Sequence, residues 1–263
     1  MLFLVDQSTS MDERITAPKA PALSKARSVT NLLNMLLLDL VLTCTKGEDV
    51  LDRCHVGVIT YGHAGARTAP GFPGLMSLPV LAACPLREEV QITPRYDGIG
   101  GFVEVESRTP VWVDPMAYGK TPMCGALQRA KALLDPWVRA HPVSSPPIVF
   151  NISDGIATDG DPLADMQALQ ALSTAVGPVL VFNILLAGVD RPTIAWPTDS
   201  KVVEAGPLHN LIEGSSALPH AMRLRANQAF GLDLPEGARG VVINAGILDL
   251  VRLLDIGSPI AHV

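Results

Sequence analysis

From residue 121 to the end of the chain, apolar strand-like segments alternate with segments of helical period. The expected helices cover 122–140, 162–175, 207–227 and 246–255, and the expected strands cover 147–153, 178–188 and 238–246. Strands that alternate with helices are typical of a parallel sheet with helices on both faces. We therefore predict an α/β fold of the doubly wound type, with a mainly parallel central sheet.

The first sixty residues fit the same pattern. Residues 1–6 form a short continuous apolar run, which is typical of a strand buried on both faces. Residues 24–44 carry apolar side chains at helical spacing, with Ser24 as the expected N-cap, and residues 55–62 form a second expected strand. Because apolar side chains nearly encircle the expected helix at 24–44, it is predicted to be buried on several sides or to offer a surface to a partner.

Residues 63–118 do not follow the alternation. They are rich in glycine and proline and have little helical period. Within them, residues 102–113 alternate well enough for one or two exposed strands, with a break expected at Pro110. We interpret 63–118 as an elaborated insertion between the second strand and the loop at Thr121, within a single domain that spans 1–263.

Composition and charge exclude several classes of protein. Hydrophobic residues make up 48% of the 263 residues and charged residues 17%, which argues against disorder. A net charge of −6, with no stripe of lysine and arginine, argues against nucleic-acid binding. The most apolar window, 31–44, is interrupted and too short to span a bilayer, so we expect no membrane insertion. Without a secretion-signal pattern, and with four scattered cysteines expected to be reduced, buried thiols, we predict a cytoplasmic protein.

Oxygen-bearing side chains collect where the expected strands end and where the helix at 122–140 begins. They are Asp6, Ser8, Ser10, Thr121 and Asp154. In doubly wound sheets ligands bind outside the carboxyl ends of the strands, so we expect these side chains to share one edge of the sheet. Two carboxylates and three hydroxyls, with no Cys or His among them, form the ligand set of a hard divalent cation such as Mg²⁺, Mn²⁺ or Ca²⁺.

Taken singly, each of these residues has a local explanation. Thr121 precedes a proline, as an N-cap residue often does, and Asp154 precedes a glycine, as in a turn. Ser8 and Ser10 also fit loop hydroxyls that bond to the nearby backbone.

Their joint occurrence favours the cation. Without one, Asp6 and Asp154 would repel each other in a partly desolvated place. Asp159 and Asp161 follow Asp154 closely, and we retain them only as candidates for helix capping or for supporting a ligand.

Three motifs carry a resemblance to a known family. D-x-S-x-S at 6–10, T-P at 121–122 and an apolar strand that ends in S-D-G at 153–155 resemble the von Willebrand factor type A (VWA) domain. In that family these elements form the metal-ion-dependent adhesion site. The match falls on the five residues named above, with Thr9 where glycine is commoner, and it runs from residue 1 to about 225 apart from 63–118. The likeness is greatest to bacterial intracellular VWA proteins of the tellurite-resistance and stress type.

The resemblance implies a function as well as a fold. It implies a protein–protein interaction module that binds a divalent cation, most simply Mg²⁺, whose coordination an acidic residue of a protein partner completes. In the family's pattern Thr121 would bind the cation directly in the partner-bound form, and Asp154 would bind it directly or through water. The chain would then be a non-enzymatic subunit of an intracellular bacterial stress, defence or signalling assembly.

Two alternatives remain open from the residues alone. The first is a Mg²⁺-dependent phosphatase or phosphotransfer enzyme with Asp6 as the nucleophile. A phosphatase of the haloacid-dehalogenase type would need a second aspartate two residues after the first, where this chain has Ser8. The second is a VWA scaffold that has lost the metal and binds partners through the apolar helix at 24–44.

Overall fold

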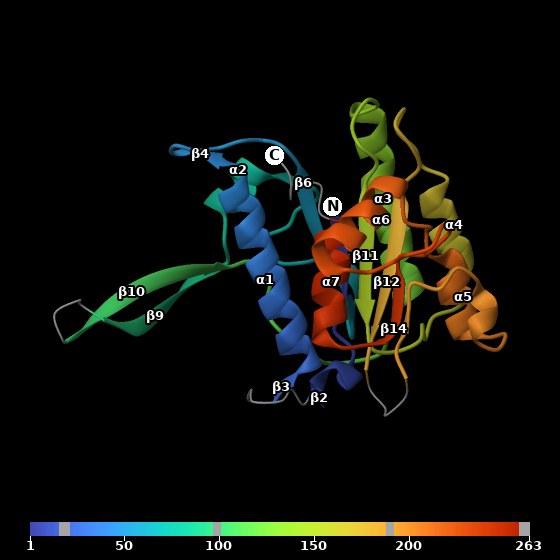
Figure 1. Cartoon of the computed structure of the whole chain (residues 1–263), viewed down its shortest axis with the longest axis horizontal. Coiled ribbons are helices and arrows are strands. Elements are labelled where there is room, and N and C mark those ends of the chain that lie inside the picture. The colour runs from blue at the N-terminus through green and yellow to red at the C-terminus, as the bar shows by residue number, and fades with distance from the viewer. Residues whose placement is uncertain (16–21, 97–100, 188–191, 258–263) are drawn as a thin grey trace.

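The computed structural model describes residues 1–15, 22–96, 101–187 and 192–257. A central, mostly parallel sheet carries helices on both faces, which confirms the predicted α/β class (Figure 1). The strands of the sheet are β1 (Leu2–Asp6), β6 (His55–Gly62), β7 (Gly65–Thr68), β11 (Ile148–Ser153), β12 (Leu180–Leu186), β13 (Ile194–Ala195) and β14 (Val241–Ala245), with the short β8 (Met76–Ser77) paired to β6.

The order of the parallel strands creates a switch point. Across the sheet they run β6, β1, β11, β12 and β14, and β7 and β13 add antiparallel edges. The chain therefore moves in one direction from β1 to β6 and in the other direction from β11 onward. The point of reversal lies between β1 and β11, which pair in parallel from Leu2↔Val149 to Val5↔Ile152. Ligands of doubly wound sheets bind outside the carboxyl ends of the strands at such a point.

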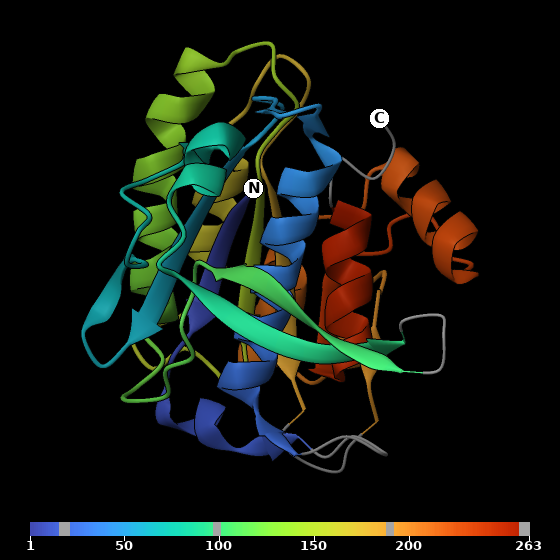
Figure 2. The same cartoon turned by 90° about the vertical axis from the view of Figure 1, so that its left-hand side faces the viewer.

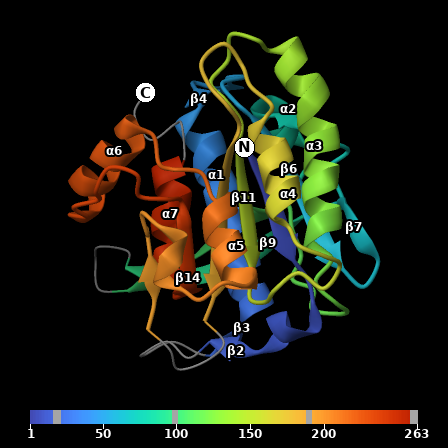
Figure 3. The same cartoon turned by 90° about the vertical axis from the view of Figure 1, so that its right-hand side faces the viewer.

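Helices cover both faces of the sheet. They are α1 (Lys25–Thr43), α2 (Leu78–Ala83), α3 (Met123–Ala140), α4 (Leu163–Gln170), α5 (Pro207–Gly214), α6 (His220–Phe230) and α7 (Ile247–Gly257). On β1, Phe3 and Val5 belong to the core shared with α1 and α7, whereas Leu2 and Leu4 belong to the core shared with α3 and α4 (Figures 1 and 3). Each of these four side chains is buried, which contributes about 1.5–3 kcal/mol per residue.

Helix α1 forms where its cap and apolar stripe predict. Ser24 is the N-cap, and its hydroxyl accepts a hydrogen bond from the Arg27 N–H at 3.3 Å. The buried stripe of α1 includes Ala26, Val29, Leu33, Leu37 and Leu40. On the outer side Met35 and Leu42 remain 64% and 61% exposed, so the helix is not buried all round.

The insertion 63–118 contains more regular structure than its sequence predicted. After β7, β8 and α2, the strands β9 (Arg87–Tyr96) and β10 (Phe102–Val111) form an antiparallel ribbon that projects from the body of the protein (Figures 1 and 2). The expected break at Pro110 is wrong, because β10 continues through it opposite Glu88. A two-stranded ribbon tolerates proline, since each strand has an open edge toward which the proline nitrogen can point.

Two predicted helices are shorter than expected. The helix predicted at 162–175 ends at Gln170, and the one predicted at 207–227 is divided into α5 and α6. The division falls at Ser215–Pro219, where Ser215 accepts a hydrogen bond from Asn183 and Pro219 is the N-cap of α6. The remaining short elements are β2 (Arg14–Ile15), β3 (Leu23–Ser24), β4 (Thr45–Lys46), β5 (Asp49–Val50) and two 3-10 turns at Thr9–Asp12 and Ser200–Val202. Among the described residues, no helix is both long enough and apolar enough to cross a membrane.

Candidate metal centre

The loops after β1 and β11 meet at the switch point. Asp6 is the last residue of β1, and Asp154 directly follows the last residue of β11. Asp6 is 1% exposed, and the Asp154 side chain has no exposed surface. The sheet therefore brings two acidic side chains, 148 residues apart in the sequence, into one buried place.

Four of the five predicted ligands form one hydrogen-bonded group. The Ser8 N–H donates to Asp6 Oδ1 at 2.7 Å, and Ser8 Oγ lies 3.1 Å from Ser10 Oγ. The Ser10 hydroxyl donates to Asp154 Oδ1 at 2.6 Å. These contacts connect the first loop to the loop after β11 and bring four oxygen-bearing side chains together.

Thr121, the fifth predicted ligand, lies beside the same group. It is 5% exposed, and a Cβ placed on Gly155 would be 3.7 Å from its Oγ1. Within the described residues, no hydrogen bond joins the Thr121 hydroxyl to the other four side chains. The alternative interpretation of Thr121 as an N-cap is wrong, because α3 has Pro122 at its cap position and no cap from that hydroxyl.

The aspartates at 159 and 161 act at helix ends. Asp159 accepts hydrogen bonds from the backbone N–H groups of Cys124 and Gly125, at 3.1 and 2.9 Å, at the start of α3. Asp161 accepts from the Leu163 N–H at 3.0 Å, at the start of α4. Both carboxylates thus satisfy N–H groups that a helix leaves unpaired at its first turn. Their capping role is confirmed.

A glycine holds the loop that carries Thr121. The Thr9 N–H donates to the Gly119 carbonyl, and the Gly119 N–H donates to Thr9 Oγ1, each at 3.0 Å. Gly119 has φ +102°, and a Cβ there would lie 2.4 Å from the His63 backbone. Only glycine fits this position without displacing His63. Thr9 therefore has a defined role: it joins the loop after β1 to the loop that carries Thr121.

The environment of Asp6 disfavours its charge. Burial raises the pKa of Asp6 from 3.8 to about 6, although hydrogen bonds from Ser153 and Ser8 oppose the shift; the nearby Asp154 charge raises it further. The Ser153 hydroxyl donates to Asp6 Oδ2 at 2.5 Å. Ser153 was not among the predicted site residues, although its place immediately before Asp154 at a strand end was a signal that could have identified it.

A buried lysine is the main feature of the site that sequence reasoning missed. Lys25, 2% exposed, donates from Nζ to Asp154 Oδ2 at 2.8 Å and to Glu13 Oε2 at 2.6 Å. Burial lowers the pKa of Lys25, but the hydrogen bonds to Asp154 and Glu13 outweigh it and leave that pKa above its ordinary value. The available signal was helical spacing, because Lys25 stands four residues before Val29, on the apolar side of α1.

The donor set fits a hard divalent cation. Every predicted donor is an oxygen, and Ser8 Oγ and Ser10 Oγ are 3.1 Å apart. Adjacent ligands of an octahedral Mg²⁺ with bonds of 2.0–2.1 Å would be separated by about 3.0 Å. Among the described residues there is no group of three or more His, Cys, Asp and Glu side chains that could hold a metal. A cation here would therefore depend on hydroxyls for half or more of its protein ligands.

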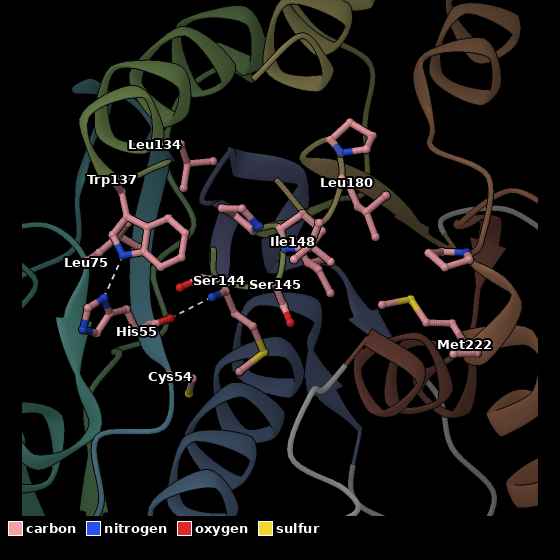
Figure 4. A pocket seen from close by; sticks show the side chains of 18 of the residues that line it. Cys54, His55, Leu75, Leu134, Trp137, Ser144, Ser145, Ile148, Leu180 and Met222 are labelled. Atoms are coloured by element: carbon pink, nitrogen blue, oxygen red, sulfur yellow. Dashed lines mark hydrogen bonds between the residues drawn. The ribbon is translucent and has the colours of Figure 1, made fainter. Parts of the chain in front are cut away.

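A separate cavity of about 660 Å³ lies at the other end of the sheet (Figure 4). It is lined by residues at the starts of β6, β11 and β12, including His55, Ile148 and Leu180, and by Trp137 of α3. The Trp137 Nε1–H donates to His55 Nδ1 at 2.7 Å. The cavity contains none of the predicted ligands. Cys54, on its wall, is a free cysteine like Cys44, Cys84 and Cys124. The expectation that all four are buried is wrong, because Cys54 is half-buried and Cys84 is exposed.

Comparison with known proteins yields distant structural similarities. No family model matches the chain, and no curated protein matches it. It is similar to an aerotolerance-related membrane protein from Bacteroides fragilis NCTC 9343 with multiple mutations to serine, at 13% identity and a TM-score of 0.39, over 78% of this chain and 72% of that one. It is also similar to an uncharacterized membrane-spanning protein from Vibrio fischeri, at 13% identity and a TM-score of 0.27, over 74% and 73% of the two chains.

Proposed function

We propose that this protein is a metal-dependent protein-binding module of the VWA type, with a metal-ion-dependent adhesion site at the switch point. The observation that supports it is the hydrogen-bonded group of Asp6, Ser8, Ser10 and Asp154. Its oxygen-only chemistry matches Mg²⁺, with Mn²⁺ and Ca²⁺ as further candidates. The order of the strands agrees with the fold expected for such a module.

Each residue has a defined part in the proposal. A bound cation would supply a Lewis-acidic centre able to hold a carboxylate from a protein partner. Asp6 supplies negative charge and is kept in orientation by Ser8 and Ser153. Ser8 and Ser10 supply neutral oxygens, which are weaker donors to the cation than carboxylates are. Thr121 supplies a further hydroxyl next to Gly155.

The cellular role is proposed from the sequence resemblance alone. On that basis the module would be a subunit of a stress, defence or signalling assembly in the bacterial cytoplasm. Its partner would present an exposed aspartate or glutamate, since that is the group able to complete the coordination of a hard cation.

The phosphotransfer alternative is less well supported. A nucleophilic aspartate must reach its substrate, whereas Asp6 is 1% exposed and both of its oxygens accept hydrogen bonds. The residue two positions later is Ser8 rather than an aspartate. Hydrolysis of an aryl phosphate with Mg²⁺ present, lost on Asp6→Asn, would restore this alternative.

A metal-independent scaffold is the second candidate, and one observation favours it. The Lys25 ammonium already forms an ion pair with Asp154, so a positive charge of the protein itself lies in the site. If Lys25 replaces the metal, neither Mg²⁺ nor Mn²⁺ should change the melting temperature of the protein. If the site binds metal, both ions should raise the melting temperature in a saturable way.

The test combines metal binding with partner capture. Mn²⁺ binding is measured by titration calorimetry on the full chain, and partner capture from a bacterial lysate is compared with and without chelator. We expect Asp6→Ala to abolish both, and Asp161→Ala, which removes a capping carboxylate, to preserve both. Unchanged Mn²⁺ binding in Asp6→Ala would show that the site is wrongly assigned.

A further inference from the structure

Lys25 is a buried cation in direct contact with the candidate site. We propose that Lys25 sets the charge of this site, so that it weakens cation binding and strengthens the capture of an acidic partner group once the cation is bound. This inference rests on the proposed function, because it concerns the regulation of the same site.

The inference rests on Asp154, whose two carboxylate oxygens accept hydrogen bonds from different partners. Its Oδ1 accepts a hydrogen bond from Ser10 at 2.6 Å, and its Oδ2 accepts one from Lys25 Nζ at 2.8 Å. The carboxylate thus lies between the serine pair and the ammonium group. A cation bound beside Ser10 would share this carboxylate with Lys25, and the two positive charges would repel each other with little water between them.

The charges of the buried groups determine the net charge of the site when a cation is bound. Asp6 and Asp154 together would neutralise a divalent cation, and Lys25 adds one positive charge to the loaded site. Glu13 also pairs with Lys25, but its side chain is 59% exposed, whereas that of Lys25 is 2% exposed. Water screens an exposed charge much more than a buried one. An incoming carboxylate would therefore meet a site that is net positive rather than neutral.

The position of Lys25 in α1 is unfavourable for a purely structural lysine. It is the first residue of the helix, where the helix dipole favours anions and disfavours cations. Burial of the ammonium adds a desolvation penalty, which the two carboxylates offset. A structural role would make Lys25 matter for stability alone, whereas the charge-setting role makes metal and acid affinities change in opposite directions.

Three variants separate these roles. Lys25→Met removes the charge and keeps most of the side-chain length, and Glu13→Gln removes the exposed countercharge and keeps Lys25. Lys46→Met is the matched control, an exposed lysine beyond the far end of the 19-residue α1 and so about 28 Å away. If Lys25→Met does not fold, Glu13→Gln decides the test, since its exposed side chain can be changed without disturbing the core.

The measurements use Mn²⁺ alone and then Mn²⁺ with sodium acetate as the acidic probe. Lys25→Met is expected to bind Mn²⁺ about tenfold more tightly, and Glu13→Gln severalfold more weakly, than the unmodified protein. Acetate that binds the loaded site raises the apparent Mn²⁺ affinity by linkage. We expect this enhancement to decrease in Lys25→Met, to increase in Glu13→Gln and to stay unchanged in Lys46→Met.

The outcomes distinguish the two proposals. If Mn²⁺ binds the unmodified protein and not Asp6→Ala, but a folded Lys25→Met binds it equally or more weakly, the charge-setting role is wrong and the metal site stands. A Glu13→Gln variant that binds Mn²⁺ more tightly likewise overturns the role of Lys25. If Mn²⁺ does not bind the unmodified protein, both proposals fall.

Discussion

Replacement of Asp6 by asparagine should stabilise the metal-free protein. Asparagine has nearly the same shape as aspartate, and its Oδ1 can still accept the hydrogen bond from the Ser8 N–H. Its Nδ2 can donate to Ser153 Oγ, so the contact to the end of β11 is kept with the direction of donation reversed. What disappears is a negative charge on a side chain that is 1% exposed.

The magnitude follows from the pKa of Asp6. A rise from 3.8 to about 6 is a shift of roughly two units, each equivalent to 1.36 kcal/mol, so the ionised carboxylate destabilises the fold by about 3 kcal/mol. The folded state holds the proton more tightly than the unfolded state. The stability that Asp6 contributes by binding a proton is therefore fully present below pH 3.8 and is lost as the pH rises through about 6. For a chain of this size, 3 kcal/mol corresponds to roughly 6–12 °C in melting temperature.

The assay is thermal unfolding in EDTA from pH 3.5 to 8. The melting temperature of Asp6→Asn should equal that of the unmodified protein near pH 3.5, exceed it increasingly up to about pH 6, and keep a constant lead above that. Asp39→Asn, which alters an exposed aspartate of α1, is the control and should show no such divergence. Saturating Mg²⁺ should raise the melting temperature of the unmodified protein and of Asp39→Asn, but not that of Asp6→Asn.

Two results would refute this reasoning. If Asp6→Asn is less stable than the unmodified protein at pH 8 in EDTA, the buried charge is not a source of strain. If the difference in melting temperature is the same at pH 3.5 and pH 8, it does not arise from ionisation of Asp6.

Further predictions concern the loops around the site. The apparent Mn²⁺ affinity, measured by calorimetry, should rise from pH 5 and level off above about pH 6, because Asp6 must lose its proton; a flat profile would contradict this. Asp159→Ala should lower the melting temperature through loss of a helix cap, about 1 kcal/mol, with Mn²⁺ affinity unchanged, whereas Thr121→Ala should weaken partner capture more than it changes stability. Gly119→Ala should destabilise the fold by about 1–3 kcal/mol in urea unfolding and weaken Mn²⁺ binding, and normal stability would show that its left-handed conformation is not required.

Local patterns predicted the elements that flank the switch point. β1, α1 and β11 each show a distinctive sequence pattern, which is a continuous apolar run for the strands and an apolar stripe with a cap for the helix. The region 63–118 does not, because the strands of the ribbon β9–β10 lack a buried face to impose an apolar pattern: Val90 and Ile92 are 53% and 61% exposed. The division between α5 and α6 coincides with a hydrogen bond from Asn183 to Ser215, a contact between residues 32 apart that a local pattern does not reveal.

The site was predictable to the extent that parallel topology determines it. Because the carboxyl ends of neighbouring parallel strands share one edge, Asp6 and Asp154 could be placed together before their contacts were known. Lys25 could not, since its ion pair joins residues 129 apart and depends on how α1 rotates about its own axis. Helical spacing from Val29 limited that rotation and identified a charge on an apolar face, but it could not identify the partner.

The arrangement of Asp6, Asp154 and Lys25 also explains how a bound cation would change both the stability of the fold and the affinity for a partner. Folding brings Asp6 and Asp154 together and holds their oxygens through Ser8, Ser10 and Ser153, so little reorganisation remains when a cation arrives. The unfavourable charge of Asp6 is retained in the metal-free fold, because Lys25 pairs with Asp154 and not with Asp6. A divalent cation relieves that charge, whereas the lysine limits how tightly the cation is held. We therefore expect moderate cation affinity, a gain in stability set by that affinity and by the cation concentration, and a further gain when an acidic partner binds.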